Sequence, residues 1–385
     1  MTEMNMNLIK ASLCSLFLIF SSQVFSDEAL DSTLETIESS IIQQNSKAMD
    51  KIFNFEKFLD RALEPLTGVS AKNKSDFRRG ASTSSGLLSE RMISSLANAV
   101  ITRLKISQEK GNQKALYRFD LGEGGYAYLE FILRKTEQNN YEVIDWYSHV
   151  TSSFASESVR QVLVFAFPNE GMLDKFLNVV SGNQADIKKF TQAMIAFSKT
   201  RNPYPLIKTY EASGDTVKKN ANISMIYLTL AGQTNDSAIY EKALKLFAKN
   251  HGNDPRFAFA MVDHYFTIGE YGKAVSALNS FERKIDVADP ALYFLRANSY
   301  LLAQNYQKSI EQSQQALALD PGFEDAYWSE INAQVAIKNF KKSVELLSIL
   351  ENNFGYLFET EHFLEDDTFS PLVKSRVFID WINAE

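Results

Sequence analysis

The sequence predicts an α+β N-terminal domain, made of helices and a three-stranded antiparallel meander, followed by an all-α array of paired helices. Three observations predict this fold class. Short runs in the first half alternate apolar and polar residues, one segment recurs in the second half, and apolar residues keep helical spacing almost everywhere else. We expect the α+β domain over residues 27–168, a helical connector over 169–221, helical repeats over 222–353 and a C-terminal cap over 354–385.

The N-terminus has the features of a cleavable export signal. Residues 8–20 are mostly apolar, and Lys10 lies before the richest part of this run. The residues Val24-Phe25-Ser26 fit a cleavage site. The run is shorter than the roughly 20 apolar residues that a membrane span needs. We therefore predict a signal peptide over residues 1–26, cut after Ser26, with translation starting at Met1 or Met6.

The position of the single cysteine and the net charge indicate which compartment and which classes of partner to expect. The single cysteine, Cys14, lies inside the predicted signal, and the apolar run follows it, unlike the arrangement in a lipoprotein signal. The mature chain would lack thiols, which suits a periplasmic or secreted protein with no membrane insertion after cleavage. The net charge of −7 argues against a nucleic-acid partner, because such partners need a basic surface.

The first part of the mature chain is predicted to be helical. Apolar residues at helical spacing predict helices over residues 30–41 and 49–63. Residues 67–86 are rich in Gly, Ser, Lys and Asn and predict a loop. A further helix is predicted over residues 87–106, because one stripe contains Leu88, Met92, Leu96, Val100 and Leu104.

Three strands are predicted next, over residues 115–120, 126–134 and 141–150. Turn-forming residues, including Gly122-Glu123-Gly124-Gly125, separate them and predict hairpins. Apolar and polar residues alternate in the second run, which predicts a sheet that is buried on one face. A helix is predicted near residues 156–167.

One set of side chains on these strands could form a small-molecule site. Asp145, Tyr147 and His149 alternate along the third strand and so share a face, and Arg118 could join them from the first strand. The order of helices and meander resembles the cone-shaped folds of the ketosteroid-isomerase-like kind, which implies acidic or histidine side chains lining a concave sheet. The other interpretation is that these residues form the solvated face of a half-buried sheet. A pocket that buries Asp145 and His149 together would favour the first.

The second half contains an internal repeat. An aromatic residue begins a similar segment four times, with spacings of 31, 35 and 34 residues, and a small residue follows it three positions later. The aromatic residues are Tyr240, Tyr271, Tyr306 and Phe340, and the small residues are Ala243, Ala274, Ser309 and Ser343. The small residues lie where the second helix of each pair must approach the first closely.

This pattern resembles the tetratricopeptide repeat (TPR), whose period is about 34 residues. The resemblance is best in the copies that start at Pro290 and Glu324, and weakest over residues 222–252. It departs from the family at Gln334, where an aromatic residue is expected. The resemblance implies a TPR-like α-α superhelix in which the first helix of each pair lines a concave groove. Residues 354–385 resemble the closing segment that covers the last repeat.

The expected groove residues form two rows. Phe259, Phe294 and Trp328 repeat with the period of the array, and Asp263, Asn298 and Asn332 follow them four positions later. Residues four apart share a helix face, so aromatic side chains would lie beside short polar ones. The aromatics could hold apolar side chains of a partner, and the Asn amides could pair with a peptide backbone. The alternative is that the aromatics form the core between repeats.

The motifs favour binding over catalysis. No Walker loop, Gly-x-Ser-x-Gly elbow, His-Glu-x-x-His helix or calcium loop is present. The four histidines are scattered without ligand spacing, so no catalytic residue, metal or cofactor is predicted. We expect an exported scaffold or adaptor that binds a protein or peptide partner of unknown identity. The alternatives are a structural subunit of an envelope assembly and a small-ligand-binding or enzymatic α+β domain with accessory repeats.

Overall fold

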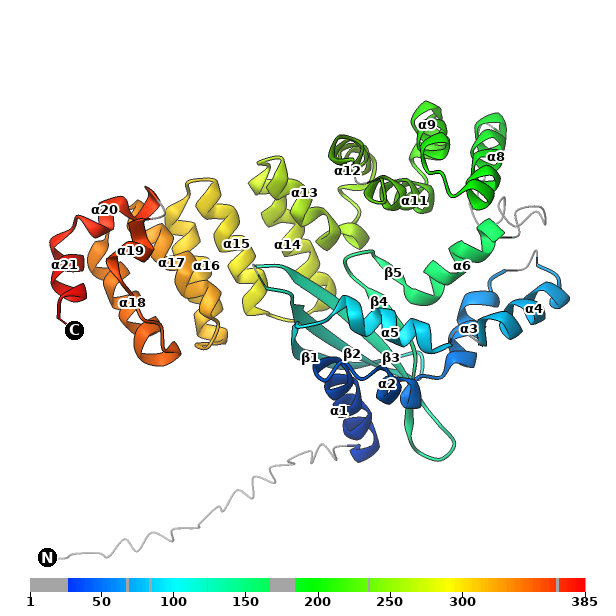
Figure 1. Ribbon diagram of the computed structural model, residues 1–385, viewed down its shortest axis with the longest axis horizontal. Helices are drawn as coiled ribbons and strands as arrows, with labels where there is room; N and C mark the ends of the chain where they lie inside the picture. The colour runs from blue at the N-terminus through cyan, green and yellow to red at the C-terminus, as the bar shows by residue number, and fades with distance from the viewer. Residues whose placement is uncertain are drawn as a thin grey trace, which may run out of the picture.

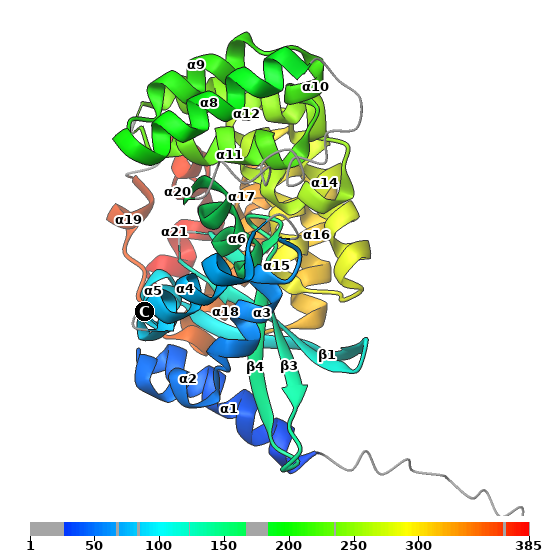
Figure 2. The ribbon, with the colours of Figure 1, turned by 90° about the vertical axis from the view of Figure 1, so that its right-hand side faces the viewer.

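The computed structural model describes residues 27–384, apart from 67–68, 83–84, 123, 167–183, 235 and 365–366. The predicted signal segment, residues 1–26, lies outside the described residues. Within the described chain, a five-stranded antiparallel sheet lies between N-terminal helices and a long helical array that arches over it (Figures 1 and 2). The predicted architecture, an α+β part followed by a helical region, is confirmed.

The described helices before the sheet are α1 (Glu28–Ile42), α2 (Ser46–Ile52), α3 (Phe55–Leu63), α4 (Ala71–Ser82) and α5 (Ser85–Ser95). The helix predicted over residues 49–63 is divided between α2 and α3. The division occurs because the backbone N–H of Asn54 donates to the carbonyl of Val143 on the sheet, at 2.8 Å. The Asn54 side chain then accepts from the N–H of Lys57 at 2.9 Å and caps α3.

Helix α4 falls within residues 67–86, so the loop predicted there was wrong. The segment contains few apolar residues, and its pattern therefore lacks the stripe that indicates a helix. Ion pairs join it to neighbouring residues instead: Arg78 binds Glu56 at 3.2 Å and Asp60 at 2.6 Å.

The strands follow one another in sequence order across the sheet. They are β1 (Val100–Glu109), β2 (Asn112–Asp120), β3 (Tyr126–Lys135), β4 (Tyr141–Ser148) and β5 (Ser153–Phe154). The three predicted strands correspond to β2, β3 and β4. The helix predicted over residues 87–106 was wrong beyond Ser95, because Asn98 adopts a left-handed φ of 66° and the β-branched residues from Val100 pair with β2.

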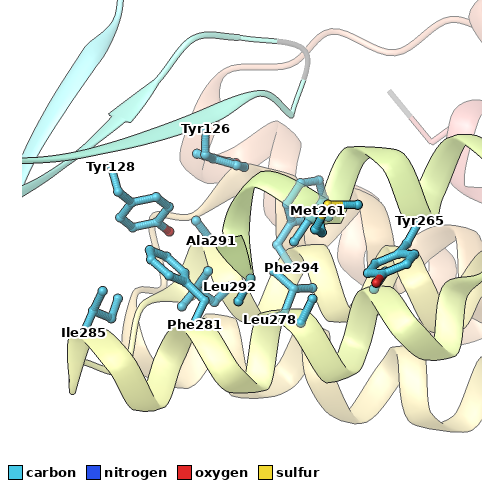
Figure 3. Packing of buried hydrophobic residues seen from close by; sticks show 14 of the residues in the cluster. Tyr126, Tyr128, Met261, Tyr265, Leu278, Phe281, Ile285, Ala291, Leu292 and Phe294 are labelled. Atoms are coloured by element: carbon cyan, nitrogen blue, oxygen red, sulfur yellow. The ribbon is translucent and has the colours of Figure 1, made fainter. Parts of the chain in front are cut away.

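Both faces of the sheet are buried, so the prediction of one solvated face was wrong. On one face, Tyr117, Phe119 and Phe131 pack with Leu34 and Ile37 of α1. On the other face, the residues in between pack against the array: Leu116, Tyr126 and Tyr128 join a cluster with Phe281 and Phe294 (Figure 3). The array is thus the second layer of the sheet's core.

The helices after the sheet begin with α6 (Ala155–Ala166), α8 (Gln184–Thr200), α9 (Tyr204–Ala212) and α10 (Asp215–Lys218). Four helix pairs follow: α11 (Ala221–Gly232) with α12 (Ser237–His251), α13 (Val262–Thr267) with α14 (Tyr271–Ile285), α15 (Pro290–Leu302) with α16 (Tyr306–Leu319), and α17 (Glu324–Ala336) with α18 (Phe340–Phe354). Two short 3-10 turns, η1 (Pro255–Phe257) and η2 (Phe259–Met261), precede α13. The predicted copies at Pro290 and Glu324 start where α15 and α17 start.

Small residues and a terminal cap complete the array. Ala243, Ala274, Ser309 and Ser343 have no exposed surface, as expected of residues at close contacts between paired helices. The last pair is covered by α19 (Thr360–Leu364), η3 (Asp367–Phe369), α20 (Ser370–Val373) and α21 (Arg376–Ile382). Phe363, Leu372 and Phe378 from this segment are buried with Leu347 and Leu350 of α18. The segment from α19 to α21, in its described residues, therefore covers the apolar end of the array.

Candidate functional site

A groove of about 620 Å³ on the array contains five of the six predicted partner-binding residues. These are Asp263, Phe294, Asn298, Trp328 and Asn332. The sixth, Phe259, does not belong to its lining. The other lining residues include Gly124, Asp325 and Ser329, together with apolar side chains at Phe266, Leu295, Leu301 and Leu302.

The first helices of successive pairs position the polar row. Asn298 lies one turn beyond Phe294 on α15, and Asn332 lies one turn beyond Trp328 on α17. The same spacing fails in the earlier pair, because Phe259 begins the 3-10 turn η2 whereas Asp263 belongs to α13. A 3-10 turn has three residues per turn, so Phe259 leaves the row and Asp263 keeps its place.

The three residues of the aromatic row already pack against other aromatic rings of the same chain. The ring of Phe259 lies 4.9 Å from that of Tyr128 on the sheet, and the ring of Phe294 lies 6.2 Å from that of Tyr126. Trp328 contacts Tyr356, at 5.7 Å between ring centroids. The interpretation of these aromatics as core therefore holds for Phe259 and for the buried Phe294, whereas half-buried Trp328 also faces the groove.

Part of the polar row keeps unused hydrogen-bonding groups. The Asn298 side-chain oxygen accepts from the Ser329 hydroxyl at 2.9 Å. Within the described chain, neither the Asn298 amide nitrogen nor the Asn332 side chain has a hydrogen-bond partner. A side-chain amide offers two N–H donors and a carbonyl acceptor, so this row can still bind a polar ligand.

The groove is acidic. Its lining contains two carboxylates, Asp263 and Asp325, and no Lys or Arg among the described residues. The surrounding protein partly desolvates Asp263 and raises its pKa. Burial also raises the pKa of Asp325, and the Tyr126 hydroxyl, which donates a 2.5 Å hydrogen bond, opposes this increase. Asp263 nevertheless remains exposed and Asp325 is half-buried, so both carboxylates stay accessible to a cation in the groove.

The sheet contributes a wall that the sequence did not reveal. Gly124 lies in the turn between β2 and β3, has a φ of 73° and lines the groove. A Cβ atom there would lie 3.5 Å from the Phe294 ring. Nothing in the repeat pattern points to a turn in the other half of the chain. Asp325, by contrast, lies three residues before Trp328 on one helix, so the same-face rule could have identified it.

A buried ion pair holds the sheet to the array. Asp289 has no exposed surface; it caps α15 by accepting from the N–H of Ala291 at 3.1 Å. It also binds the guanidinium of Arg118, and its second oxygen accepts from the Tyr128 hydroxyl at 2.8 Å. Arg118 therefore binds the array, and the hypothesis that it joins Asp145, Tyr147 and His149 was wrong.

The three candidates on β4 and beyond it have different surroundings. Asp145 is fully buried and accepts from Arg61 at 2.8 Å and from the Ser156 hydroxyl at 2.6 Å, which fixes the start of α6. Tyr147 and His149 instead line a cavity between the sheet and the array. Asp145 and His149 are thus both buried, yet they do not share a pocket.

The described chain gives no sign of a metal centre or a membrane span. No group of three or more His, Cys, Asp or Glu side chains among its residues is arranged to hold a metal ion. None of its helices combines the length and hydropathy that a membrane crossing requires.

Comparison with known proteins gives a distant structural likeness. No protein-family model matches the chain, and no curated protein matches it. A crystal structure of the MamA protein aligns with 46% of this chain and 100% of its own, at 17% sequence identity and a TM-score of 0.29.

Proposed function

We propose that the protein is an exported scaffold whose array, of the tetratricopeptide kind, binds an extended peptide segment of a protein partner in the groove. The observation that carries this proposal is the polar row, in which Asn298 and Asn332 present amide groups beside Trp328. Amides pair with the donors and acceptors of an extended backbone, and the indole can cover an apolar side chain. Export is proposed from the signal-like residues 1–26.

The charge of the groove selects the partner. Asp263 and Asp325 lie in the lining without a described Lys or Arg beside them there. The surrounding protein raises the pKa of both carboxylates, although Asp263 is exposed, and a cation from a partner would favour their charged forms. We therefore propose a partner segment that combines Lys or Arg with apolar side chains. Complementary charge would also discriminate against acidic segments, because like charges in an interface repel.

Labelled peptides test this proposal. We expect peptides of lysine and leucine to bind, and peptides of equal length made of glutamate and leucine not to bind, in fluorescence anisotropy. Asn298→Ala combined with Asn332→Ala should weaken binding of the lysine peptide roughly ten-fold or more, since each lost hydrogen bond is worth about 1 kcal/mol. Thermal unfolding should change little, because neither asparagine is buried.

The exposed Asn353 on α18 provides the matched control, and Asn353→Ala should leave peptide affinity unchanged. Equal binding of both peptides would rule out selection by charge. Unchanged affinity in the double variant would place the binding site outside the groove.

A further inference from the structure

A second cavity lies where the sheet meets the array. Its volume is about 470 Å³, within the usual range of small-molecule sites. The sheet side supplies Lys114, Glu130, Tyr147 and His149, and the array supplies Arg256 and Lys284. This cavity is separate from the groove, with which it shares no lining residue.

His149 is buried in this cavity without a hydrogen-bond partner. Its side chain is 95% buried, since 5% of its surface is exposed, and neither ring nitrogen has a partner in the described structure. The ring packs edge-on against Tyr147 and Phe281, at 4.9 and 5.1 Å between centroids. A neutral imidazole carries one donor and one acceptor, and leaving both unmatched in a protein interior is unfavourable. A ligand that pairs with the ring would remove this penalty.

Lys284 is the second incomplete group. Its ammonium donates weak hydrogen bonds to the Tyr147 hydroxyl at 3.3 Å and to the Arg256 carbonyl at 3.4 Å. Within the described residues, no carboxylate lies within ion-pair distance of it. The other cations of the lining are paired: Lys105 with Asp286, Lys114 with Glu130 and Arg256 with Asp254, at 2.8, 2.7 and 2.6 Å. Lys284 is exposed as a whole, yet the protein around its ammonium lowers its pKa, in the direction expected of a cation without a close counter-charge.

The side chains that line the cavity indicate which charge a ligand would carry there. Four cationic and three anionic side chains line the cavity, and Asp254 outside the lining pairs with Arg256, so Lys284 is the lining cation that keeps no close carboxylate among the described residues. Apolar surface is also present, from Leu116, Phe154 and Ile285. A ligand with one negative charge and a small apolar body would match both properties.

We propose that this cavity binds a small organic acid, whose carboxylate pairs with Lys284 and whose remaining polar atom hydrogen-bonds the neutral imidazole of His149. The apolar body of the acid lies against Leu116 and Phe154. The site requires both halves of the chain, since His149 follows β4 and Lys284 belongs to the last turn of α14. An acid bound there would stabilise the contact between the sheet and the array.

Small acids and their uncharged esters test the proposal on the mature chain. Lactate, mandelate and benzoate, each beside its methyl ester, serve as probes in saturation-transfer NMR and thermal unfolding. We expect at least one acid to bind and to raise the unfolding temperature, and no ester to do so. Lys284→Met should weaken the binding of that acid at least about ten-fold, because a hydrogen bond between charged groups is lost.

Two further measurements keep the test decisive. Lys245→Met, which changes an exposed lysine of α12, should leave acid binding unchanged. In the wild-type protein, the imidazole nitrogen resonances of His149 should shift with the acid and not with its ester, whether or not a variant folds. Equal binding of acid and ester, no binding of any acid, or equal binding by wild type and a folded Lys284→Met variant would overturn the proposal.

Discussion

At the scale of single residues, His149 is held in its neutral form by its surroundings. Burial, together with the positive charges of Lys284 and Lys114, lowers its pKa from 6.5 to about 3. The same residue in the unfolded chain takes up a proton near pH 6.5. The folded state therefore receives the full benefit of a neutral His149 only above pH 6.5. The free energy of unfolding decreases as the pH falls from 6.5 towards 3, because the unfolded state then binds a proton on His149 and the folded state does not.

This linkage predicts a measurable pH dependence. Between pH 7 and pH 5, His149 should reduce the free energy of unfolding by about 2 kcal/mol, from the difference between the two pKa values. His149→Phe retains the aromatic packing and should remove this part of the dependence, as measured by urea unfolding at both values. The exposed His362 provides the control, since His362→Phe should preserve the wild-type dependence. Identical slopes for wild type and His149→Phe would mean that His149 does not resist protonation.

At the scale of elements, the close contacts between paired helices depend on small side chains. Ser309 on α16 is completely buried, and its hydroxyl has no hydrogen-bond partner in the described structure. Its role at this position is therefore to occupy little space. The size of the side chain matters there, and its polarity does not.

Two substitutions separate these properties. Ser309→Leu should destabilise the protein by about 1–3 kcal/mol, because added methyl groups overpack a close contact. Ser309→Ala should be neutral or stabilising, because it removes an unmatched buried hydroxyl. Urea unfolding measures both, and Gln315→Leu on the exposed side of α16 should change the free energy by less than about 0.5 kcal/mol. A destabilising Ser309→Ala together with a harmless Ser309→Leu would contradict the helix contact described above.

The repeating elements were predictable from sequence because their signals are local. Tyr271, Tyr306 and Phe340 begin α14, α16 and α18, and each belongs to a pattern that recurs within one helix pair. β1 was mistaken for helix because Leu88, Met92 and Leu96 do follow a helical period, which Val100 and Leu104 continue by coincidence. The pairing with β2 makes that segment a strand, and a short stretch of sequence carries no information about this pairing.

The candidate site was predictable only in part. Asn298 and Asn332 follow the period of the repeat, so their shared location required only the helix geometry. The packing of Phe259 and Phe294 under the sheet depends on Tyr128 and Tyr126, which are separated from them by more than a hundred residues. Such contacts leave no periodic trace in the sequence. The apolar alternation of β3 in fact suggested that the face carrying these tyrosines was exposed.

At the scale of the whole molecule, Asp289 and Arg118 connect the two halves of the chain. Both are buried, and the pair lies under Phe323 and Tyr126, whose rings face the guanidinium at 5.4 and 6.0 Å. A buried ion pair contributes little to net stability compared with an apolar contact. Removal of one partner is costly, however, because the other charge stays buried without compensation.

Asp289→Asn should therefore destabilise the protein by about 3–5 kcal/mol, although asparagine can still cap α15. Asp286→Asn is the matched control: Asp286 binds Lys105 at the same junction, but its side chain is 88% exposed. That change should cost much less, because water screens an exposed ion pair. Urea unfolding followed by circular dichroism compares the two variants. Similar losses in both would show that the buried pair has no special part in joining the halves.

The contact between sheet and array also changes the mechanics of the array. An ordinary helical repeat array behaves as a spring, because each pair touches only its neighbours and small rotations add along its length. Here one strand spans three successive pairs: Tyr128 touches Phe259 and Phe281, and Tyr126 touches Phe294 and Asp325. The sheet therefore fixes the relative positions of the three helix pairs from α13 to α18. Under tension, the pairs from α13 to α18 would therefore keep their relative positions, and the groove would keep its shape.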